Sequence, residues 1–351
     1  MLYNKFYILF IRVDFLKLLR KSCILIMTAA VILSSGCSFD SEYNCEFFAM
    51  DTVMTISAYG SKSESAVKAA QNEINRLDKL LSVQSKNSEI YRLNRLKEMT
   101  VSEDTLTLIT RSKEIYTLTD GAFDISCEPL IREWGFYSGL ENKVPSQQAI
   151  ENALKGVGAE HINIENSTVK LDENTSLDLG AVAKGYASRK ASEILKENGV
   201  SSALMSLGGN VRAVGSKPDG ENWSVAITNP DDNSKSIGTL KISDKAVVTS
   251  GGYQRYFEEN GQIYHHIIDT KTGHPADSGL KSVTVVSEDD TLADALSTSL
   301  FVMGLEKSKE FYSQNSLLFG AVFITHKGEI FVTDNLNDSF MSKQGFEVIS
   351  V

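Results

Sequence analysis

A change in hydrophobic periodicity near residue 160 places the strongest constraint on the fold of this chain. Before it, apolar residues recur every three or four positions, which predicts amphipathic helices over 64–81 and 104–118 and a short helix over 146–156. After it, short apolar segments predict strands, interrupted only by helices over 182–198 and 291–304. Helices grouped before strands, instead of alternating with them, predict an α+β fold and not a series of βαβ units.

The predicted strands are short and closely spaced. They cover residues 50–59, 161–165, 168–171, 203–207, 223–227, 237–242, 246–249, 264–268, 283–286 and 317–324. No change in composition marks a linker between them, so residues 46–351 are expected to form a single catalytic unit.

Composition narrows the class of protein. The chain is 42% hydrophobic and 23% charged, which is typical of a folded globular protein. Its net charge of −10 argues against a nucleic-acid partner, because such a surface needs a basic stripe.

The N-terminus resembles a bacterial lipoprotein signal. A basic segment precedes an apolar run over 23–33 that is too short to span a bilayer, and small residues lead to Cys37. We therefore expect a signal peptide over 1–36, lipidation of Cys37 and a polar tether over 37–45. The mature protein would then be anchored to a membrane by lipid and face the extracytoplasmic side; secretion without lipid is the alternative.

Two cysteines remain in the expected mature chain besides Cys37. Cys45 and Cys127 could pair in an oxidising compartment, and their spacing does not decide the matter. No CxxC motif is present, which excludes a zinc ribbon.

Residues 177–195 combine a short alternating run, a glycine turn and a helix. The helix N-terminus offers unpaired N–H groups, Gly180 and Gly185 allow close approach to the backbone, and Lys184 adds a positive charge. This pattern predicts an anion site; an ordinary strand–helix joint with a surface lysine is the alternative.

Asp294 and Thr298 lie four residues apart and therefore share one face of the helix predicted over 291–304. A carboxylate and a hydroxyl in this position could hold a hard cation such as Mg²⁺. The alternative is a capping box formed by Thr291 and Asp294.

The densest polar cluster is residues 264–275. In a continuous strand His266, Ile268 and Thr270 would share one side, and His266 could orient or accept a proton. A strand-end histidine with an ordinary hydrogen bond is the alternative. Glycine pairs over 207–210 and 250–253 could allow a ligand to approach, or form bulges. The fingerprints of Rossmann, P-loop and nucleophile-elbow proteins are missing.

Taken together, these motifs resemble the FAD:protein FMN transferase (ApbE) family. The resemblance runs from about residue 46 to the C-terminus, in the order typical of the family. It rests on residues 50–52, 88–94, 119–125, 134–136, 177–186, 206–211, 250–256, 266–275 and 294–298.

The resemblance implies an ApbE or T-fold-like α+β fold, with helices packed on sheets. It also implies transfer of FMN from FAD to a threonine or serine hydroxyl of another extracytoplasmic protein, with release of AMP. Mg²⁺ would be held by the Ala181 carbonyl, Asp294 and Thr298. The FAD site would include Met50, Gln84, Ala122, Phe123, Asp124, Asp178, Lys184 and Ile268, with Gln84 standing where relatives often have a tyrosine that stacks on FAD.

Within this framework His266 is the candidate proton acceptor, and Asp178 is the candidate for positioning the flavin or the nucleotide. The acceptor consensus of the family is not found in this chain, so we expect a separate acceptor protein. Two alternatives remain: a pyrophosphatase that splits FAD into FMN and AMP, and a lipoprotein that binds FAD without catalysis.

Overall fold

The computed structural model describes residues 41–350. Residues from Glu42 onward form one compact unit. The signal peptide expected over 1–36 and the lipidated Cys37 lie outside the described residues. Within residues 41–350, no helix combines the length and the apolar character needed to cross a bilayer.

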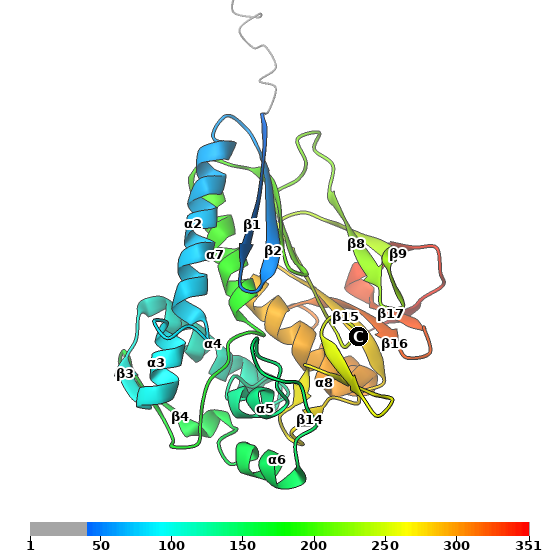
Figure 1. Ribbon diagram of the computed structural model, residues 1–351. Coiled ribbons are helices and arrows are strands. Elements are labelled where there is room, and N and C mark those ends of the chain that lie inside the picture. Colours follow the sequence, from blue (N-terminus) through cyan, green and yellow to red (C-terminus); the bar gives the residue numbers. More distant parts are fainter. Residues whose placement is uncertain (1–40, 351) are drawn as a thin grey trace, which may run out of the picture. The chain divides into compact units, whose positions relative to one another are not determined.

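A nine-stranded sheet forms the centre of the unit (Figure 1). All neighbouring strands pair antiparallel except β17 and β19, which are parallel. In spatial order the strands are β1 (Glu42–Ala49), β2 (Thr52–Tyr59), β6 (Ser202–Leu207), β7 (Asn210–Val214), β10 (Ala246–Gly251), β15 (Leu280–Ser287), β16 (Gly320–Thr325), β17 (Ile330–Thr333) and β19 (Glu347–Ile349).

Each face of this sheet is covered by a different layer. The main core lies against α2 (Ser63–Leu81), α7 (Ala183–Glu197) and α8 (Asp290–Asn315). Figure 1 shows α2 and α7 side by side, next to the β1–β2 hairpin. A second core lies beneath a small sheet, whose strands in order are β18 (Phe340–Ser342), β9 (Asp232–Ile242) and β8 (Trp223–Asn229).

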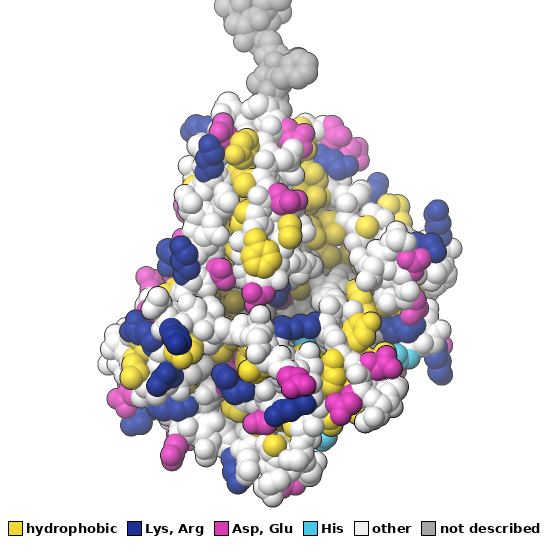
Figure 2. Space-filling model, viewed as in Figure 1, with side chains coloured by type: hydrophobic (Ala, Val, Ile, Leu, Met, Phe, Trp, Pro, Cys, Tyr) yellow, Lys and Arg dark blue, Asp and Glu magenta, His cyan; other side chains and the backbone are white. Residues whose placement is uncertain are grey.

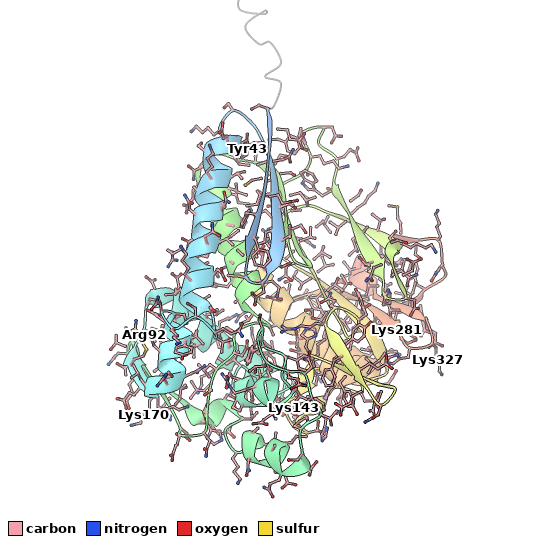
Figure 3. All side chains as sticks on the ribbon, viewed as in Figure 1. Tyr43, Arg92, Lys143, Lys170, Lys281 and Lys327 are labelled. Carbon is pink, nitrogen blue, oxygen red and sulfur yellow. The ribbon has the colours of Figure 1, made fainter. Side chains whose placement is uncertain are left out.

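The remaining elements surround the lower end of the unit as drawn in Figure 1. A third, smaller core around Trp134 and Phe136 joins some of these elements, and the others contribute their buried residues to the main core. Lys143, labelled in Figure 3, belongs to the loop after these aromatics, and the next residue, Val144, donates its N–H to Glu259 at 3.2 Å. The elements are α3 (Glu89–Leu96), β3 (Glu98–Thr100), α4 (Glu103–Leu118), α5 (Glu128–Glu133), α6 (Gln147–Leu154), β4 (Ile162–Glu165), β5 (Thr168–Leu171), and the hairpins β11 (Tyr256–Glu259)–β12 (Gln262–His265) and β13 (Ile268–Asp269)–β14 (His274–Pro275).

The mixed sheet with packed helices confirms the predicted α+β class. The expected tether over 37–45 is wrong from Glu42 onward, because β1 begins there. Its polar residues face outward, while Tyr43, Cys45 and Phe47 pack against the main core. In this edge strand polar and half-buried residues alternate, and from the sequence alone such a strand is difficult to distinguish from a polar tether.

The helix predicted over 291–304 continues to Asn315. Gly304, with φ of 77°, breaks the helical geometry at the predicted end, and a further helical segment follows. Cys45 and Cys127 are both free thiols. Gly208 and Gly209 form a two-residue hairpin turn between β6 and β7, with φ of 60° and 97°, and not a bulge.

Candidate active site

Within the described chain, residues 177–179 pair with no neighbouring strand and residues 180–182 form a turn into α7, so the alternating run expected there is not a β-strand. The Asn94 side chain pairs with the backbone of Leu177 through bonds of 2.7 and 2.9 Å. The Asp178 N–H donates to the Ile125 carbonyl at 2.7 Å. The backbone polar groups of this segment are thus hydrogen-bonded by a side chain and a loop, and not by a neighbouring strand.

Both oxygens of the Asp178 carboxylate accept hydrogen bonds. Oδ1 accepts from the Gly180 N–H at 2.6 Å, and Oδ2 accepts from the Tyr137 hydroxyl at 2.5 Å. Burial, followed by the Asp178 charge, raises the pKa of Tyr137 well above its usual value, so this phenol stays protonated. Asp178 is therefore held in one orientation by a residue that the sequence analysis did not identify.

The start of α7 lies directly against α8. The Gly185 N–H donates to Asp294 Oδ2 at 2.7 Å. Gly185 is the third residue of α7, so its N–H has no acceptor within the helix, and Asp294 supplies one. Ala181 precedes the helix, and within residues 41–350 no hydrogen bond to its carbonyl is found. The structure thus holds the start of α7 against Asp294 and leaves the Ala181 carbonyl oxygen open.

Only glycine fits at position 185. A Cβ there would lie 2.3 Å from the Asp290 carbonyl oxygen and 2.7 Å from Asp294 Cβ. The glycine predicted to admit a ligand instead admits another helix, and this contact builds the mouth of the site.

Asp294 is not part of a helix cap. The N-cap of α8 is Asp289, which accepts the Leu292 N–H at 3.1 Å. Thr291 already lies inside the helix, and its hydroxyl has no hydrogen-bond partner among residues 41–350. The capping-box alternative is therefore wrong, and the Asp294 carboxylate, only 4% exposed, is directed toward α7.

Thr298 lies one turn further along α8. It is partly exposed, although the residues from Thr291 to Ser297 are buried. Its Oγ1 lies 3.3 Å from Ser250 Oγ at the end of β10. The 250–253 glycine segment therefore reaches the site through Ser250.

The donors around this mouth are a carboxylate, a hydroxyl and a carbonyl. Within the described residues, no three histidine, cysteine, aspartate or glutamate side chains gather as they would around a metal ion. Oxygen donors of mixed type suit a hard cation that keeps several waters. The open Ala181 carbonyl at the start of α7 and the carboxylate that contacts this turn are donors of the kind that Mg²⁺ prefers.

His266 lies in a bend between β12 and β13, so the strand expected over 264–268 is interrupted there. Its N–H and its Nδ1 are both 3.1 Å from the Arg255 carbonyl oxygen. Because a carbonyl only accepts, Nδ1 carries the proton and Nε2 carries the lone pair. Burial lowers the pKa of His266 to about 4, and the charges of Arg255 and Lys184 act in the same direction.

Lys184 lies in the first turn of α7, half-exposed, and its Nζ is 3.3 Å from the Gly180 carbonyl. The start of α7 therefore combines a lysine with a helix N-terminus.

The other predicted FAD residues lie around a second group of contacts. Thr270 donates to the Gly121 carbonyl at 3.3 Å, which brings residues 121–125 beside 268–270. Phe123 is 2% exposed and Ile268 is 8% exposed, so their side chains belong mainly to the cores. Asp124 accepts from the Ser126 N–H and hydroxyl, and burial raises its pKa. Ala122, between Gly121 and Phe123, keeps part of its surface exposed.

Met50 and Gln84 lie at the margins of this arrangement. Met50 occupies the β1–β2 turn with φ of 49° and packs against the main core. Gln84 is exposed, and its side-chain amide donates to the Ser138 carbonyl at 3.0 Å, next to Tyr137.

An open cavity of about 450 Å³ has Ser176, two residues before Asp178, in its lining, and neither Ala181 nor Asp294 lines it. Its lining is polar and carries both signs of charge. The lining residues are Lys97, Glu128, Pro129, Arg132, Glu133, Ala149, Asn152, Ala153, Glu173, Asn174 and Ser176.

Comparison with known proteins yields one consistent family. The model of the ApbE family matches residues 50–322. A FAD:protein FMN transferase of Vibrio cholerae is 32% identical over 306 residues, covering 84% of this chain and 91% of that protein. A FAD:protein FMN transferase of Escherichia coli K12 is 34% identical over 275 residues, covering 75% and 77%.

Solved structures of similar proteins have the same fold. The ApbE protein of Thermotoga maritima superposes with a TM-score of 0.79 at 32% identity, covering 84% of this chain and 98% of that one. The flavinyl transferase ApbE of Pseudomonas stutzeri, in its apo form, has a TM-score of 0.77 at 29% identity, covering 86% and 97%.

Proposed function

This chain belongs to the ApbE family, and we propose that it transfers FMN from FAD to a threonine or serine hydroxyl of a separate acceptor protein, releasing AMP. The observation that carries the proposal is the contact between the start of α7 and Asp294. It gathers a helix N-terminus, Lys184, an open carbonyl and a buried carboxylate at one place.

Mg²⁺ would be held by Asp294, Thr298 and the Ala181 carbonyl. When bound, the ion supplies positive charge to the diphosphate and to the phosphate that leaves. The helix dipole at the start of α7 and the Lys184 ammonium add to this potential from the protein side. Positive potential of this kind suits a dianionic group, and the diphosphate of FAD is such a group.

The reaction exchanges one phosphorus–oxygen bond for another. The acceptor oxygen attacks the phosphorus of the FMN half, and the bond from that phosphorus to the bridging oxygen breaks. AMP leaves with the bridging oxygen. The hydroxyl proton passes to Nε2 of His266, whose Nδ1–H is fixed on the Arg255 carbonyl.

Asp178 serves a different purpose in this proposal. Both of its oxygens already accept short hydrogen bonds from Gly180 and Tyr137, so it is poorly placed to take a proton. We assign it to positioning the flavin or the nucleotide. Met50, Gln84, Ala122, Phe123, Asp124 and Ile268 would line the rest of the FAD site; Phe123 and Ile268 would act mainly through their backbone, because their side chains are buried.

The test is incubation of the protein with FAD, Mg²⁺ and an acceptor protein, followed by mass spectrometry of the acceptor and assay of AMP. Transfer predicts AMP together with an acceptor heavier by one FMN less water. AMP with free FMN and an unlabelled acceptor would instead favour the pyrophosphatase. Bound, unchanged FAD would favour a non-catalytic FAD-binding protein.

The proposed anchoring is separate from this chemistry. A lipid on Cys37 would hold the enzyme on the extracytoplasmic side of the membrane, where its acceptor would be found. The Cys37→Ser variant should move from the membrane fraction to the soluble fraction while keeping its activity; retention in the membrane fraction would contradict lipid anchoring at Cys37.

A further inference from the structure

A buried charged residue lies one helical turn before the candidate metal ligand on α8. Asp290 is 1% exposed, and both of its carboxylate oxygens are engaged. Oδ1 accepts the Ser188 hydroxyl of α7 at 2.6 Å, and Oδ2 accepts Arg212 Nη1 of β7 at 2.8 Å. Arg212 Nη1 also donates to the Glu288 carbonyl at 3.0 Å, just before α8 begins.

This contact is the second of two between the same helices. The first joins Gly185 to Asp294, and the second joins Ser188 to Asp290. Residue numbers rise along α7 as they fall along α8, so the helices run in opposite directions where they touch. Each pair lies about one turn from the other on both helices, which fixes the spacing and the relative rotation of α7 and α8.

The Ala181 carbonyl and Asp294 lie on opposite sides of this helix contact. Their separation therefore depends on how α7 is seated on α8. A divalent cation needs its donors at defined distances, and groups that orient the donors affect metal affinity strongly.

A buried ion pair contributes little to stability, because desolvation of the two charges offsets their attraction. The Arg212–Asp290 pair is better explained by its effect on the position of α8. It ties α8 to the central sheet, and Ser188 ties α7 to the same carboxylate.

We propose that Ser188, Asp290 and Arg212 are positioning residues that set the geometry of the Mg²⁺ site through the α7–α8 contact. The inference rests on the proposed function and deepens it. None of the three is itself a proposed ligand of the ion; they act on Ala181 and Asp294 through the two helices.

The experiment measures Mn²⁺ binding to the full-length protein by electron paramagnetic resonance, without FAD, and AMP release at increasing Mg²⁺. Ser188→Ala should raise the Mn²⁺ dissociation constant about 10-fold, and excess Mg²⁺ should restore its kcat. Asp290→Asn should behave in the same way.

Ser192→Ala is the matched control. Ser192 is also buried on α7, one turn later, but within the described part of the chain its hydroxyl donates only to the local Arg189 carbonyl, at 3.0 Å. This variant should bind Mn²⁺ as the wild type does. A purely structural role for Ser188 would lower thermal stability in both serine variants and leave the dissociation constant unchanged.

The variant Asp294→Ala shows whether a negative result contradicts only the positioning role or the proposed metal site as well. If Asp294→Ala abolishes Mn²⁺ binding and Ser188→Ala binds like Ser192→Ala, the positioning role is overturned and the metal site stands. If the wild type and Asp294→Ala bind Mn²⁺ equally, the metal site is wrong and the positioning role falls with it.

Discussion

The Gly185 amide donates a 2.7 Å hydrogen bond to the carboxylate of Asp294, 109 residues further along the chain. Gly185 lies in the first turn of α7, where N–H groups have no partner within the helix, so Asp294 satisfies this N–H from a second helix. Within residues 41–350 the Ala181 carbonyl, just before the helix, accepts no hydrogen bond.

Asp294→Ala should abolish Mg²⁺-dependent AMP release, because it removes the one charged ligand proposed for the ion. It should also lower the free energy of unfolding by about 1–3 kcal/mol, since the buried Gly185 N–H loses its acceptor. Urea unfolding and an AMP assay measure the two effects.

Asp289→Ala is the control on the same helix. It removes the N-cap of α8 and should lower the free energy of unfolding by about 0.5–2 kcal/mol. Mg²⁺-dependent AMP release should be unchanged. Full activity of Asp294→Ala would refute the proposed metal site.

Lys184→Ala should weaken FAD binding about 10-fold, or about 1.4 kcal/mol, because a positive charge is lost at the start of α7. Fluorescence titration with FAD measures the dissociation constant. Lys196→Ala, at the other end of α7, where Lys196 pairs with Asp244, should leave it unchanged. An unaltered affinity in Lys184→Ala would make this lysine an ordinary surface residue.

His266→Gln should lower kcat about 10²- to 10⁴-fold, because the proton acceptor is lost. In the wild type, kcat/KM should persist to about pH 5, with an acidic limb near the lowered pKa of about 4. A limb at the ordinary histidine pKa near 6.5 would contradict an imidazole that stays neutral at that pH.

The same pKa shift predicts a pH dependence of stability. Because the pKa of His266 is lowered in the folded protein, only the unfolded chain binds the proton between about pH 6.5 and 4. The free energy of unfolding should therefore fall as the pH drops through that window. His266→Gln should show a smaller fall in urea unfolding measured at each pH.

Tyr137→Phe should lower the free energy of unfolding by about 1 kcal/mol through loss of one hydrogen bond and should raise the KM for FAD, because Asp178 is no longer held. Tyr312→Phe removes a comparable bond, 2.5 Å from its hydroxyl to Asp334, on the far part of α8. It should lower the free energy of unfolding by a similar amount without changing the KM for FAD. Equal KM values in the two variants would contradict a role for Tyr137 in the FAD site.

Much of this arrangement follows from local patterns in the sequence. The periodicity of α2 and α7 and the short strands after residue 160 predict the elements and the α+β class, since burial of one face dictates both. The family motifs locate Asp294 and the start of α7. What local patterns do not predict is β1, whose outward polar residues hide a half-buried face.

The missed parts of the site arise from long-range contacts. Tyr137 meets Asp178 across 41 residues, and Asn94 takes the place of a strand beside Leu177 across 83. The Thr291–Asp294 spacing matches a cap, yet Asp289 occupies that position and Asp294 bonds to α7. Sequence spacing predicts which residues can contact one another within a helix, but it does not predict contacts with a distant helix.

The hairpin β1–β2 carries exposed Phe48 and Val53 near its turn. Figure 2 shows hydrophobic side chains on the outer face of this hairpin. They flank Met50, the residue there that the family resemblance assigns to FAD.

Anomalous X-ray diffraction from crystals of the protein grown with Mn²⁺ and FAD tests the central claim most directly. We predict one Mn²⁺ peak within about 2.0–2.4 Å of Asp294, Thr298 and the Ala181 carbonyl, in contact with the FAD diphosphate. A diphosphate bound elsewhere, or a metal peak away from the α7–α8 contact, would contradict the account.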